Sequence, residues 1–417
     1  MKVLVMGAGV VGTTAAWYLA KAGHQVTVVD RQPGAGLETS FANGGQISAS
    51  HAEPWANPAT PGKALRWMGR EDAPLVFRWR RWDPPLWAWG LRFLTNCTER
   101  RTKINTERTL RLALYSRRAL AELRDETGIQ YDQRRQGILH IYRDRHEYGH
   151  ALRAADLMAA YGLPRLPKTP PECVTLEPAL ADVAGELTGG LFSPDDESGD
   201  AHLFTTGLAA RCAERGVTFR YDVTIHGLVS EAGRITSVAT DQGALTADAY
   251  LLALGSWSPR LASGVGLRLP IYPAKGYSAT IAVDDPSGAP CVSITDDENK
   301  LVFSRFGERL RCAGTAELAG WNATLTETRA RALVTKARAL FPRAGDFDAA
   351  TLWAGLRPVT PDSVPILGAT PFGNLWLDTG HGTLGWTLSC GSGRVIADLI
   401  SGRRPDIDTN GLDLARF

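Results

Sequence analysis

The stretch KVLVMGAGVVG, residues 2–12, decides the fold of this chain of 417 residues. Its first residues are nearly all apolar and do not alternate with polar ones, which predicts a strand buried on both faces of a parallel sheet. Glycines follow in the spacing Gly-x-Gly-x-x-Gly, and VVGTTAAWYLAKAG (10–23) then carries apolar residues at helical spacing. HQVTVVD (24–30) predicts a second buried strand. This order of strand, glycine turn, helix and strand is typical of a dinucleotide-binding unit.

Each glycine of this turn has a task in that interpretation. Gly7 permits a tight turn, Gly9 lets a pyrophosphate approach the backbone, and Gly12 lets the helix pack closely on the strand. The phosphates then face the positive end of the helix, which starts at Val10 and Val11. The alternative is a glycine-rich turn that arose by chance.

The second strand ends on Asp30, which is placed to accept hydrogen bonds from a ribose. A carboxylate there repels a 2′-phosphate, so NADP is disfavoured. The fingerprint does not separate NAD from FAD. A further strand, ADAYLLALGSW (247–257), follows a long β-rich stretch, and this order is more typical of a large flavin-binding domain than of an NAD dehydrogenase.

The composition predicts an ordinary enzyme of the cytoplasm. Hydrophobic residues make up 44% and charged residues 22% of the chain, and the net charge of +2 gives no reason to expect nucleic acid as a partner. The six cysteines show no metal-ligand spacing, so we expect reduced thiols and no metal. Glycines interrupt the apolar start, which argues against a signal peptide, and no apolar run is long enough to span a bilayer.

Beyond the dinucleotide unit, the chain resembles the D-amino acid oxidase-like FAD-dependent oxidoreductases, and among them the small-subunit type of bacterial D-amino acid dehydrogenases. The resemblance runs essentially from end to end. It is carried by the opening residues through FANGGQIS and by ANPATPGKALRWM, LTGGLFSPDDESGDAHLFT, YPAKGYSATI, LFPRAGDF, GLRPVTPDSVPILG and NLWLDTGHGTLGWTLSCGSG.

The resemblance implies an α/β fold of mixed α+β character, in which a Rossmann-like FAD-binding domain is interleaved with a mixed-sheet substrate-binding domain. The FAD-binding domain is expected to take residues 1–55, 171–260 and 350–417, and the substrate-binding domain residues 56–170 and 261–349. The first boundary falls in a proline-rich stretch, which suits a crossover between domains.

The activity that the resemblance implies is oxidative deamination of D-amino acids to 2-oxo acids and ammonia. A hydride passes from the α-carbon to flavin N5, and the electrons go on to a quinone or another acceptor. Such chemistry depends mainly on alignment, which fits the lack of a Ser/His/Asp constellation. FAD should be non-covalent, because relatives with covalent flavin carry a cysteine at the position of Gly355.

Three other functions stay open. One is an oxidase or dehydrogenase of secondary or small amino acids, such as D-proline, hydroxyproline, sarcosine or glycine. Another is a flavin-carrying subunit that only relays electrons, and the last is a plain NAD dehydrogenase.

By the same resemblance, the small and polar stretch ETSFANGGQIS (38–48) lies along the flavin, and a helix from about Leu384 to Ile400 points its N-terminus at the N1–C2=O edge of the ring. His381, just before this helix, is expected to be structural. The expected FAD-binding residues beyond the glycine turn and Asp30 are Arg31, Thr39, Ser40, Asn43, Gly44, Gly45, Gln46, Ile47, Ile225, Gly255, Gly382, Thr383, Leu384 and Gly385.

Three residues are candidates for contact with the substrate. Arg357 precedes a proline, so its backbone is extended, and its guanidinium can grip an α-carboxylate through two parallel hydrogen bonds. Tyr277 could donate to the same carboxylate or close the pocket, although a tyrosine in a strand is also a common core residue. His51 is expected at the mouth of the active site. Arg305 is a more distant candidate, and Leu301 occupies a position where some relatives place a second tyrosine.

The segment FRWRRWDPPLWAWGLRFL (77–94) combines arginines with tryptophans 79, 82, 87 and 89. Pro84 and Pro85 prevent one continuous helix. Tryptophan favours the headgroup level of a bilayer and arginine favours anionic lipid, which predicts peripheral contact with the inner face of a membrane. The alternative is that these rings pack beneath the substrate-binding domain or at a subunit contact.

Overall fold

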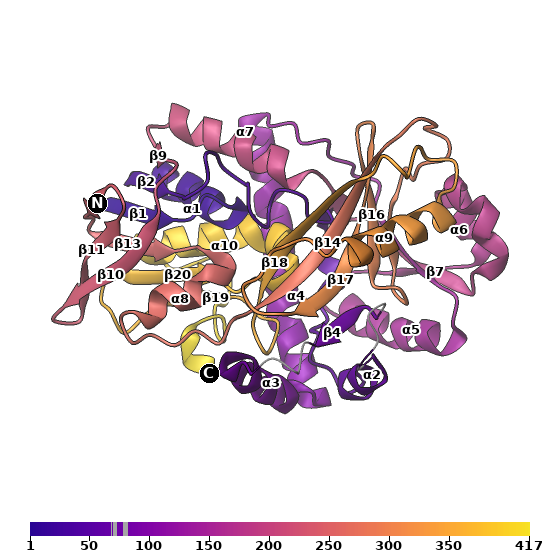
Figure 1. The fold of residues 1–417 in the computed structure, drawn as a ribbon, viewed down its shortest axis with the longest axis horizontal. Helices are drawn as coiled ribbons and strands as arrows, with labels where there is room; N and C mark the ends of the chain where they lie inside the picture. Colours follow the sequence, from indigo (N-terminus) through magenta and orange to yellow (C-terminus); the bar gives the residue numbers. More distant parts are fainter. Residues whose placement is uncertain (68, 70–72, 78–81) are drawn as a thin grey trace.

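The structure is a computed structural model that describes residues 1–67, 69, 73–77 and 82–417. Two large sheets lie next to each other, with helices around them (Figure 1). The N-terminal and C-terminal parts of the chain, indigo and yellow, share one half of the molecule. They meet in one sheet, because β1 (Lys2–Met6) pairs with β13 (Ala249–Leu252), which in turn pairs with β20 (Leu375–Thr379).

The smaller of these sheets has six strands among the described residues, in the order β19-β20-β13-β1-β2-β9. All run parallel except the edge strand β19. The three strands not yet bounded are β2 (Gln25–Val29), β9 (Thr218–Arg220) and β19 (Ile366–Ala369). The glycine turn and the acid therefore follow two neighbouring parallel strands, as the sequence predicts.

Helices and a second small sheet cover the two faces of this sheet, which explains the unbroken apolar sequence of β1. Val3 and Val5 lie in a core with the helices, while Leu4 and Met6 lie in a core with the small sheet. The helices are α1 (Val10–Lys21), α4 (Glu99–Thr127), α7 (Ala201–Glu214) and α10 (Gly385–Ile400). The other face carries β10 (Ile225–Glu231), β11 (Arg234–Thr240), β12 (Gly243–Leu245) and α8 (Ser258–Ser263).

The larger sheet is mixed and has nine strands in the part of the chain that the structure describes. Its main path runs β18-β14-β17-β16-β15-β5-β7-β6, and β4 pairs with β17. In chain order the strands are β4 (Leu75–Phe77), β5 (Ile138–Tyr142), β6 (Leu166–Lys168), β7 (Gly189–Ser193), β14 (Tyr272–Ala282), β15 (Ser293–Asp296), β16 (Leu301–Phe306), β17 (Arg309–Leu318) and β18 (Thr351–Val359).

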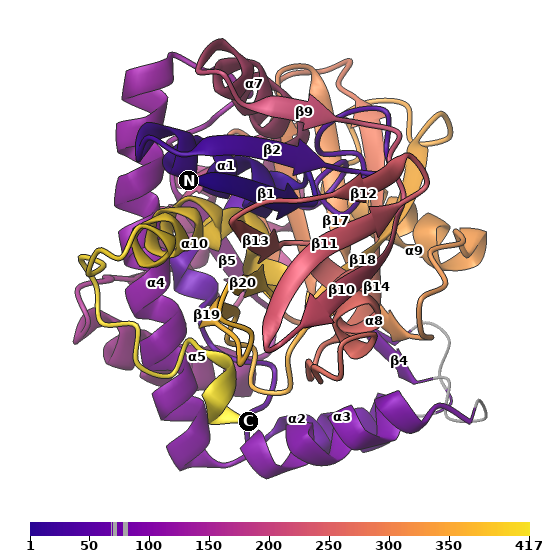
Figure 2. The same cartoon turned by 90° about the vertical axis from the view of Figure 1, so that its left-hand side faces the viewer.

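One face of the larger sheet packs against α9 (Glu327–Leu340) and the segment that holds α6 (Pro170–Leu176). The helix α5 (Arg145–Ala159) contacts β5 and β7. Two further helices, α2 (Thr60–Trp67) and α3 (Pro84–Asn96), lie together along one edge of the molecule (Figure 2). A short ribbon of β3 (Gln46–Ile47) and β8 (Glu197–Ser198) joins two segments that are distant in the sequence.

Two strands lie in a different sheet from the one that the predicted domain ranges imply. β7 and β18 fall within ranges assigned to the FAD-binding domain, but both pair in the larger sheet. Residues 173–187 also pack in the core of that sheet. Strand pairing over long sequence distances cannot be read from local patterns, which is why the ranges differ from the sheets at these points. The division into two domains stays a prediction.

The glycine turn is tightly packed. Gly7 has a φ of +111°, and a Cβ on it would lie 2.6 Å from the carbonyl oxygen of Ala253. A Cβ on Gly12 would lie 2.0 Å from the carbonyl oxygen of Gly7. The close packing of helix on strand that the spacing predicts for Gly12 is therefore confirmed.

We expect Gly12→Ala to destabilise the fold by about 1–3 kcal/mol, because the backbone of the turn must move to admit one methyl group. Thermal unfolding with and without added FAD measures this loss. Gly149→Ala is the matched control, since a Cβ there meets open space in α5 and should have a neutral or slightly favourable effect. Equal melting temperatures for Gly12→Ala and the wild type would contradict the assignment.

Candidate active site

A cavity of about 1040 Å³ lies at the carboxyl edge of the smaller sheet and continues along the larger sheet. Residues just after β1, β2 and β13 line it, as expected for a ligand site in an open α/β sheet. Strands β14, β17 and β18 border it from the other side. The cavity therefore joins the predicted dinucleotide site to the predicted substrate site.

Asp30 borders this cavity and fixes the backbone around it. Its carboxylate accepts hydrogen bonds from the amides of Ala8, at 2.7 Å, and Gln32, at 2.9 Å. Burial raises the pKa of Asp30. Arg31 pairs with Glu38 at 2.5 Å, and its guanidinium lies over the Trp257 ring at 4.3 Å. Both side chains lie where the sequence places the ribose.

The segment 38–48 runs along the cavity and is held by the larger sheet. Gly45 has a φ of +71°, and a Cβ on it would lie 2.1 Å from Phe306. A Cβ on Gly44 would lie 2.4 Å from Val302. Large side chains at these positions would therefore clash with β16. The glycines therefore let this segment pack directly against the larger sheet where it borders the cavity.

Hydrogen bonds within the protein already occupy some of the predicted FAD-binding groups. Thr39 donates to the carbonyl of Leu356 at 2.8 Å, and Ser40 accepts from the amide of Val10 at 3.0 Å. The side-chain oxygen of Asn43 accepts from the amide of Gly45 at 2.9 Å. These side chains shape the segment as well as facing the cavity.

Most of the predicted FAD-binding residues border this one cavity. Gly12 does not, because it packs beneath the turn, and Ile47 does not, because its side chain is buried in the core of the smaller sheet. The prediction that Ile47 runs along the flavin edge is thus corrected. The residues that border the cavity are Gly7, Gly9, Val10, Val11, Asp30, Arg31, Thr39, Ser40, Asn43, Gly44, Gly45, Gln46, Ile225, Gly255, Gly382, Thr383, Leu384 and Gly385.

The predicted helix near the C-terminus is present as α10, and its glycine-rich N-terminal turn faces the cavity. His381 lies just before this turn and is 3% exposed. Its Nε2 lies 3.1 Å from the hydroxyl of Ser392 and 3.3 Å from the carboxylate of Asp378. These buried contacts agree with the structural role that the sequence analysis expected, and His381 also borders the cavity.

Arg357, on β18, faces the cavity without an acidic partner. Its guanidinium donates to the carbonyls of Thr315, at 2.6 Å, and Gly314, at 3.4 Å. Among the described residues no carboxylate pairs with it, and burial lowers its pKa to about 10. Thr315 has a φ of +51°, a strained conformation for a threonine, in a bulge of β17. The bulge turns two carbonyls toward the guanidinium and leaves its charge uncompensated.

Gly276 is the residue that makes room for this guanidinium. It lies opposite Gly355 on β18, and a Cβ on Gly276 would lie 2.3 Å from Cζ of Arg357. The arginine side chain therefore lies flat on β14. Sequence reasoning missed Gly276, although a glycine inside a predicted strand is a signal of close approach.

The neighbouring Tyr277 points to the opposite face of β14, because successive side chains alternate. Its hydroxyl donates to Glu317 at 2.5 Å, and Glu317 also pairs with Lys275 at 3.2 Å. Tyr277 packs in the core with α9. The predicted contact of its phenol with a substrate carboxylate is therefore corrected. Arg305 is also directed elsewhere, since it donates to backbone carbonyls of Gly307 and Pro286.

His51 borders the cavity, as predicted, and stacks on a second histidine. Its ring centroid lies 5.7 Å from that of His140. No hydrogen bond is recorded for the His51 imidazole within the described part of the chain. Burial lowers the pKa of His51, which favours the neutral ring.

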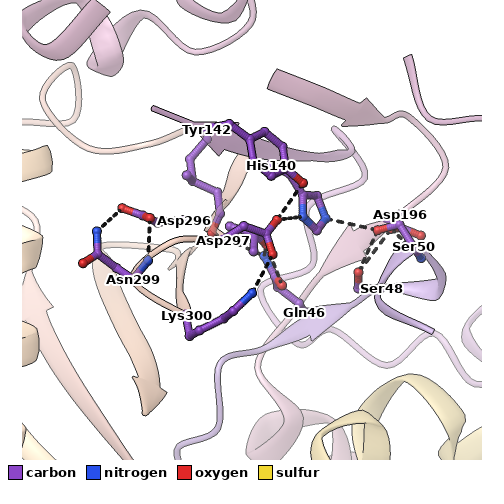
Figure 3. A network of polar contacts seen from close by, with 12 residues as sticks. Gln46, Ser48, Ser50, His140, Tyr142, Asp196, Asp296, Asp297, Asn299 and Lys300 are labelled. Atoms are coloured by element: carbon purple, nitrogen blue, oxygen red, sulfur yellow. Dashed lines mark hydrogen bonds and ion pairs between the residues drawn. The ribbon is translucent and has the colours of Figure 1, made fainter. Parts of the chain in front are cut away.

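His140 belongs to a polar network at the same end of the cavity (Figure 3). Its Nδ1 lies 2.7 Å from Asp297, and its Nε2 lies 3.3 Å from the hydroxyl of Ser50. Tyr142 donates to Asp297 at 2.9 Å. Burial, then the charge of Arg165, lowers the pKa of His140 to about 4. Sequence reasoning missed this network, although a histidine in the apolar strand ILHIY was a visible signal.

Comparison with protein families decides the class of this site. Residues 2–399 match the family of FAD dependent oxidoreductases called DAO. The chain belongs to this family. Its cofactor is therefore FAD, and the cavity fits it, because the glycine turn, Asp30 and the segment 38–48 border one continuous space.

Known relatives cover the whole chain. A D-amino acid dehydrogenase of Paramagnetospirillum magneticum is 65% identical over 417 residues, covering 100% of this chain and 99% of the relative. A D-amino acid dehydrogenase of Dechloromonas aromatica is 55% identical, covering 97% and 98%. Among solved structures, glycine oxidase from Geobacillus kaustophilus superposes with a TM-score of 0.76 at 23% identity, covering 100% and 98%, and L-proline dehydrogenase from P. horikoshii with 0.79 at 19%, covering 100% and 97%. These structures share the fold.

The lowered pKa of His140 predicts a pH dependence of stability. Between pH 6.5 and about 4, the unfolded chain binds a proton at this residue that the folded chain does not bind. The free energy of unfolding should therefore fall as the pH falls, by up to about 1.4 kcal/mol per pH unit.

His140→Gln removes this contribution and should show a smaller loss of stability between pH 7 and pH 5 in urea unfolding. His226→Gln, an exposed histidine, is the control. An unchanged loss in His140→Gln would contradict the assignment.

Proposed function

We propose that Arg357 binds the α-carboxylate of a D-amino acid and aligns its α-carbon with FAD in the same cavity. The chain oxidatively deaminates D-amino acids with FAD as cofactor, giving a 2-oxo acid and ammonia. The single observation that supports the role of Arg357 is its half-buried charge, which has no acidic partner among the described residues. A guanidinium in this state gains most from a ligand that supplies a carboxylate.

The chemistry needs few groups from the protein. When bound, FAD accepts the hydride of the substrate α-carbon. Arg357 fixes the orientation of the substrate through its two parallel N–H groups. A ring nitrogen of neutral His51 accepts a proton from the substrate ammonium, since an amine must lose its proton before oxidation. The residues of the cavity named above hold FAD in this proposal, with the N-terminus of α10 facing the charge that gathers on the ring.

The role of Arg357 is tested with two variants. Arg357→Lys keeps the charge but loses the pair of parallel N–H groups, and Arg357→Met loses both. We expect kcat/KM for D-alanine to fall in both, by roughly 2–5 kcal/mol of transition-state stabilisation in the Met variant. The FAD content should stay near that of the wild type. Arg305→Met is the control and should keep wild-type turnover. Equal turnover by Arg357→Met and the wild type would remove Arg357 from the site.

Secondary amines are the alternative class of substrate. The relatives with high identity over the full length are named D-amino acid dehydrogenases, which favours primary D-amino acids. Anaerobic turnover with D-alanine, D-proline and sarcosine separates the two classes. Faster turnover of sarcosine or D-proline than of D-alanine would favour the alternative.

The helix α3 presents an apolar face to the outside. Trp87 is 50% exposed, Leu91 67% and Leu94 54%, and their spacing places them on one face of the helix. Trp82, just before the helix, is 83% exposed. The opposite face is buried, and the indole of Trp89 donates to the carbonyl of Val359 at 2.9 Å.

The segment 77–94 that the sequence singled out therefore has both exposed and buried aromatic side chains. Trp89 packs inside the fold, so for this ring the alternative of packing beneath the substrate-binding half is correct. Trp79 lies outside the described residues. No helix among the residues that the structure describes is long and apolar enough to cross a membrane.

We propose that this apolar face rests on the surface of a membrane, where FAD passes its electrons to a quinone or another acceptor dissolved in the lipid. Exposed tryptophan and leucine suit the headgroup level. Three exposed arginines follow on the same stretch of chain, at Arg92, Arg100 and Arg101, and favour anionic lipid. The position of the enzyme would then be peripheral, on the inner face of the membrane.

The membrane contact is tested by co-sedimentation with anionic and neutral liposomes at low and high salt. We expect the wild type to bind anionic liposomes, and a variant with Trp82, Trp87, Leu91 and Leu94 replaced by Ser to bind at least about tenfold more weakly. The control replaces Leu203 and Val229, exposed apolar residues elsewhere, by Ser. A wild type that does not bind, or a variant that binds equally well, would refute the proposal.

A further inference from the structure

A second arginine borders the same cavity with unsatisfied donors. Arg165 lies between α5 and β6 and is 9% exposed. Its Nε and Nη2 atoms are buried and have no hydrogen-bond partner among the described residues. A buried guanidinium with two unpaired nitrogens is costly, because the lost hydration of these atoms is not replaced.

The acid of the His140 network, Asp297, forms no ion pair with Arg165 among the described residues. The carboxylate of Asp297 already has three partners, since it accepts from His140 and Tyr142 and lies 3.5 Å from Lys300 (Figure 3). Burial opposes ionisation of Asp297, but His140 and Lys300 hold its pKa well below the usual value. The positive charge of Arg165 therefore lacks an acid of its own.

Two other acids border this end of the cavity. Glu147 forms an ion pair with Lys63 at 2.9 Å. Glu53 accepts from Asn57 at 3.3 Å. Burial raises its pKa, against the nearby positive charges of His150, Lys300 and Arg165. Within residues 1–67, 69, 73–77 and 82–417, neither acid forms an ion pair with Arg165. Arg165 interacts with the hydroxyl of Tyr142, but its Nε and Nη2 atoms thus keep no partner of their own among the described residues.

The sheet explains why Arg165 reaches the cavity. β6, which starts directly after Arg165, pairs with β7, and β7 pairs with β5. His140 and Tyr142 lie on β5. Three segments that are distant in sequence therefore bring the arginine to the polar end of the cavity, and Arg357 borders the same cavity on β18.

We propose that Arg165 determines specificity by binding the side-chain oxygen of the substrate, in D-amino acids whose side chains end in a carboxylate or a carboxamide. This proposal rests on the proposed function, in which Arg357 holds the α-carboxylate. The N–H groups of Arg165, in the same cavity, then bind the side-chain oxygen of the substrate molecule whose α-carboxylate Arg357 binds. A site with such donors discriminates against an analogue that leaves them unpaired.

The test compares substrates of equal shape. D-Asparagine and D-aspartate match D-leucine, and D-glutamine and D-glutamate match D-homoleucine with one more methylene group. The quantity compared is kcat/KM for the polar substrate divided by kcat/KM for the apolar substrate of the same length. At one of the two side-chain lengths, we expect this ratio to be roughly tenfold or more lower in Arg165→Met than in the wild type. Arg165→Lys, which keeps the charge, should give an intermediate ratio. Arg153→Met, an exposed arginine on α5, is the control and should keep the wild-type ratio.

Unchanged ratios in Arg165→Met at both lengths would overturn the proposal. A separate experiment adds acetate or phosphate to the assay, because the guanidinium of Arg165 could bind a free anion instead. If these salts alter D-alanine turnover only when Arg165 is present, while the ratios stay unchanged, the site binds a free anion and the assignment to the substrate is wrong. Anaerobic bleaching of the wild-type flavin by D-alanine tests the proposed function separately. If D-alanine bleaches the flavin and the ratios stay unchanged, only the proposal for Arg165 fails. If D-alanine does not bleach it, the proposed function fails.

Discussion

The unpaired charge of Arg357 is the constraint on which the rest of the site depends. A guanidinium that faces a cavity with only two carbonyl partners costs free energy in the folded protein. Several features of the sheet exist to permit this arrangement. Gly276 leaves space for the guanidinium, and the strained bulge at Thr315 turns a carbonyl toward it. The fold therefore maintains an unfavourable state. In the proposed role of Arg357, the carboxylate of an amino acid would relieve it, which would couple substrate binding to the stability of the site.

The cofactor site and the substrate site form one space because the two sheets share segments of chain. Residues 38–48 follow the glycine turn and Asp30 of the smaller sheet, yet they pack against β16 of the larger one. β18 carries Arg357 and leads directly to β19 and β20 in the smaller sheet. Movement of either sheet would thus change the distance between Arg357, the proposed carboxylate-binding residue, and the bound FAD. Precise alignment of this kind supplies much of the rate in hydride transfer.

Local patterns in the sequence predicted the parts of the fold that local physics determines. The buried strand β1, the packing role of Gly12 and the helix α10 all follow from spacing within a few residues, and the structure confirms them. Arg357 also lies where the sequence placed it, on an extended strand that borders the cavity. Its lack of a partner was beyond prediction, because that depends on every acid in the chain.

Contacts between distant segments account for the failures. The face of β14 on which Tyr277 lies is set by pairing with β17 and β18, and the sequence alone left this choice open. The network of His140 and Asp297 requires the pairing of β5 with β15, which joins residues more than a hundred positions apart. Trp89 lies on the inner face of α3 while Trp87 lies on the outer face, so composition alone could not separate them.

The central claim is that the half-buried guanidinium of Arg357 requires a negative carboxylate on the substrate. Anaerobic mixing of the FAD-loaded protein with D-alanine or with D-alaninamide tests it most directly, because the amide keeps the size and the amine but lacks the charge. The account predicts that D-alanine bleaches the flavin absorbance at least about 30-fold more efficiently, which corresponds to roughly 2 kcal/mol. Equal bleaching by both compounds would contradict it.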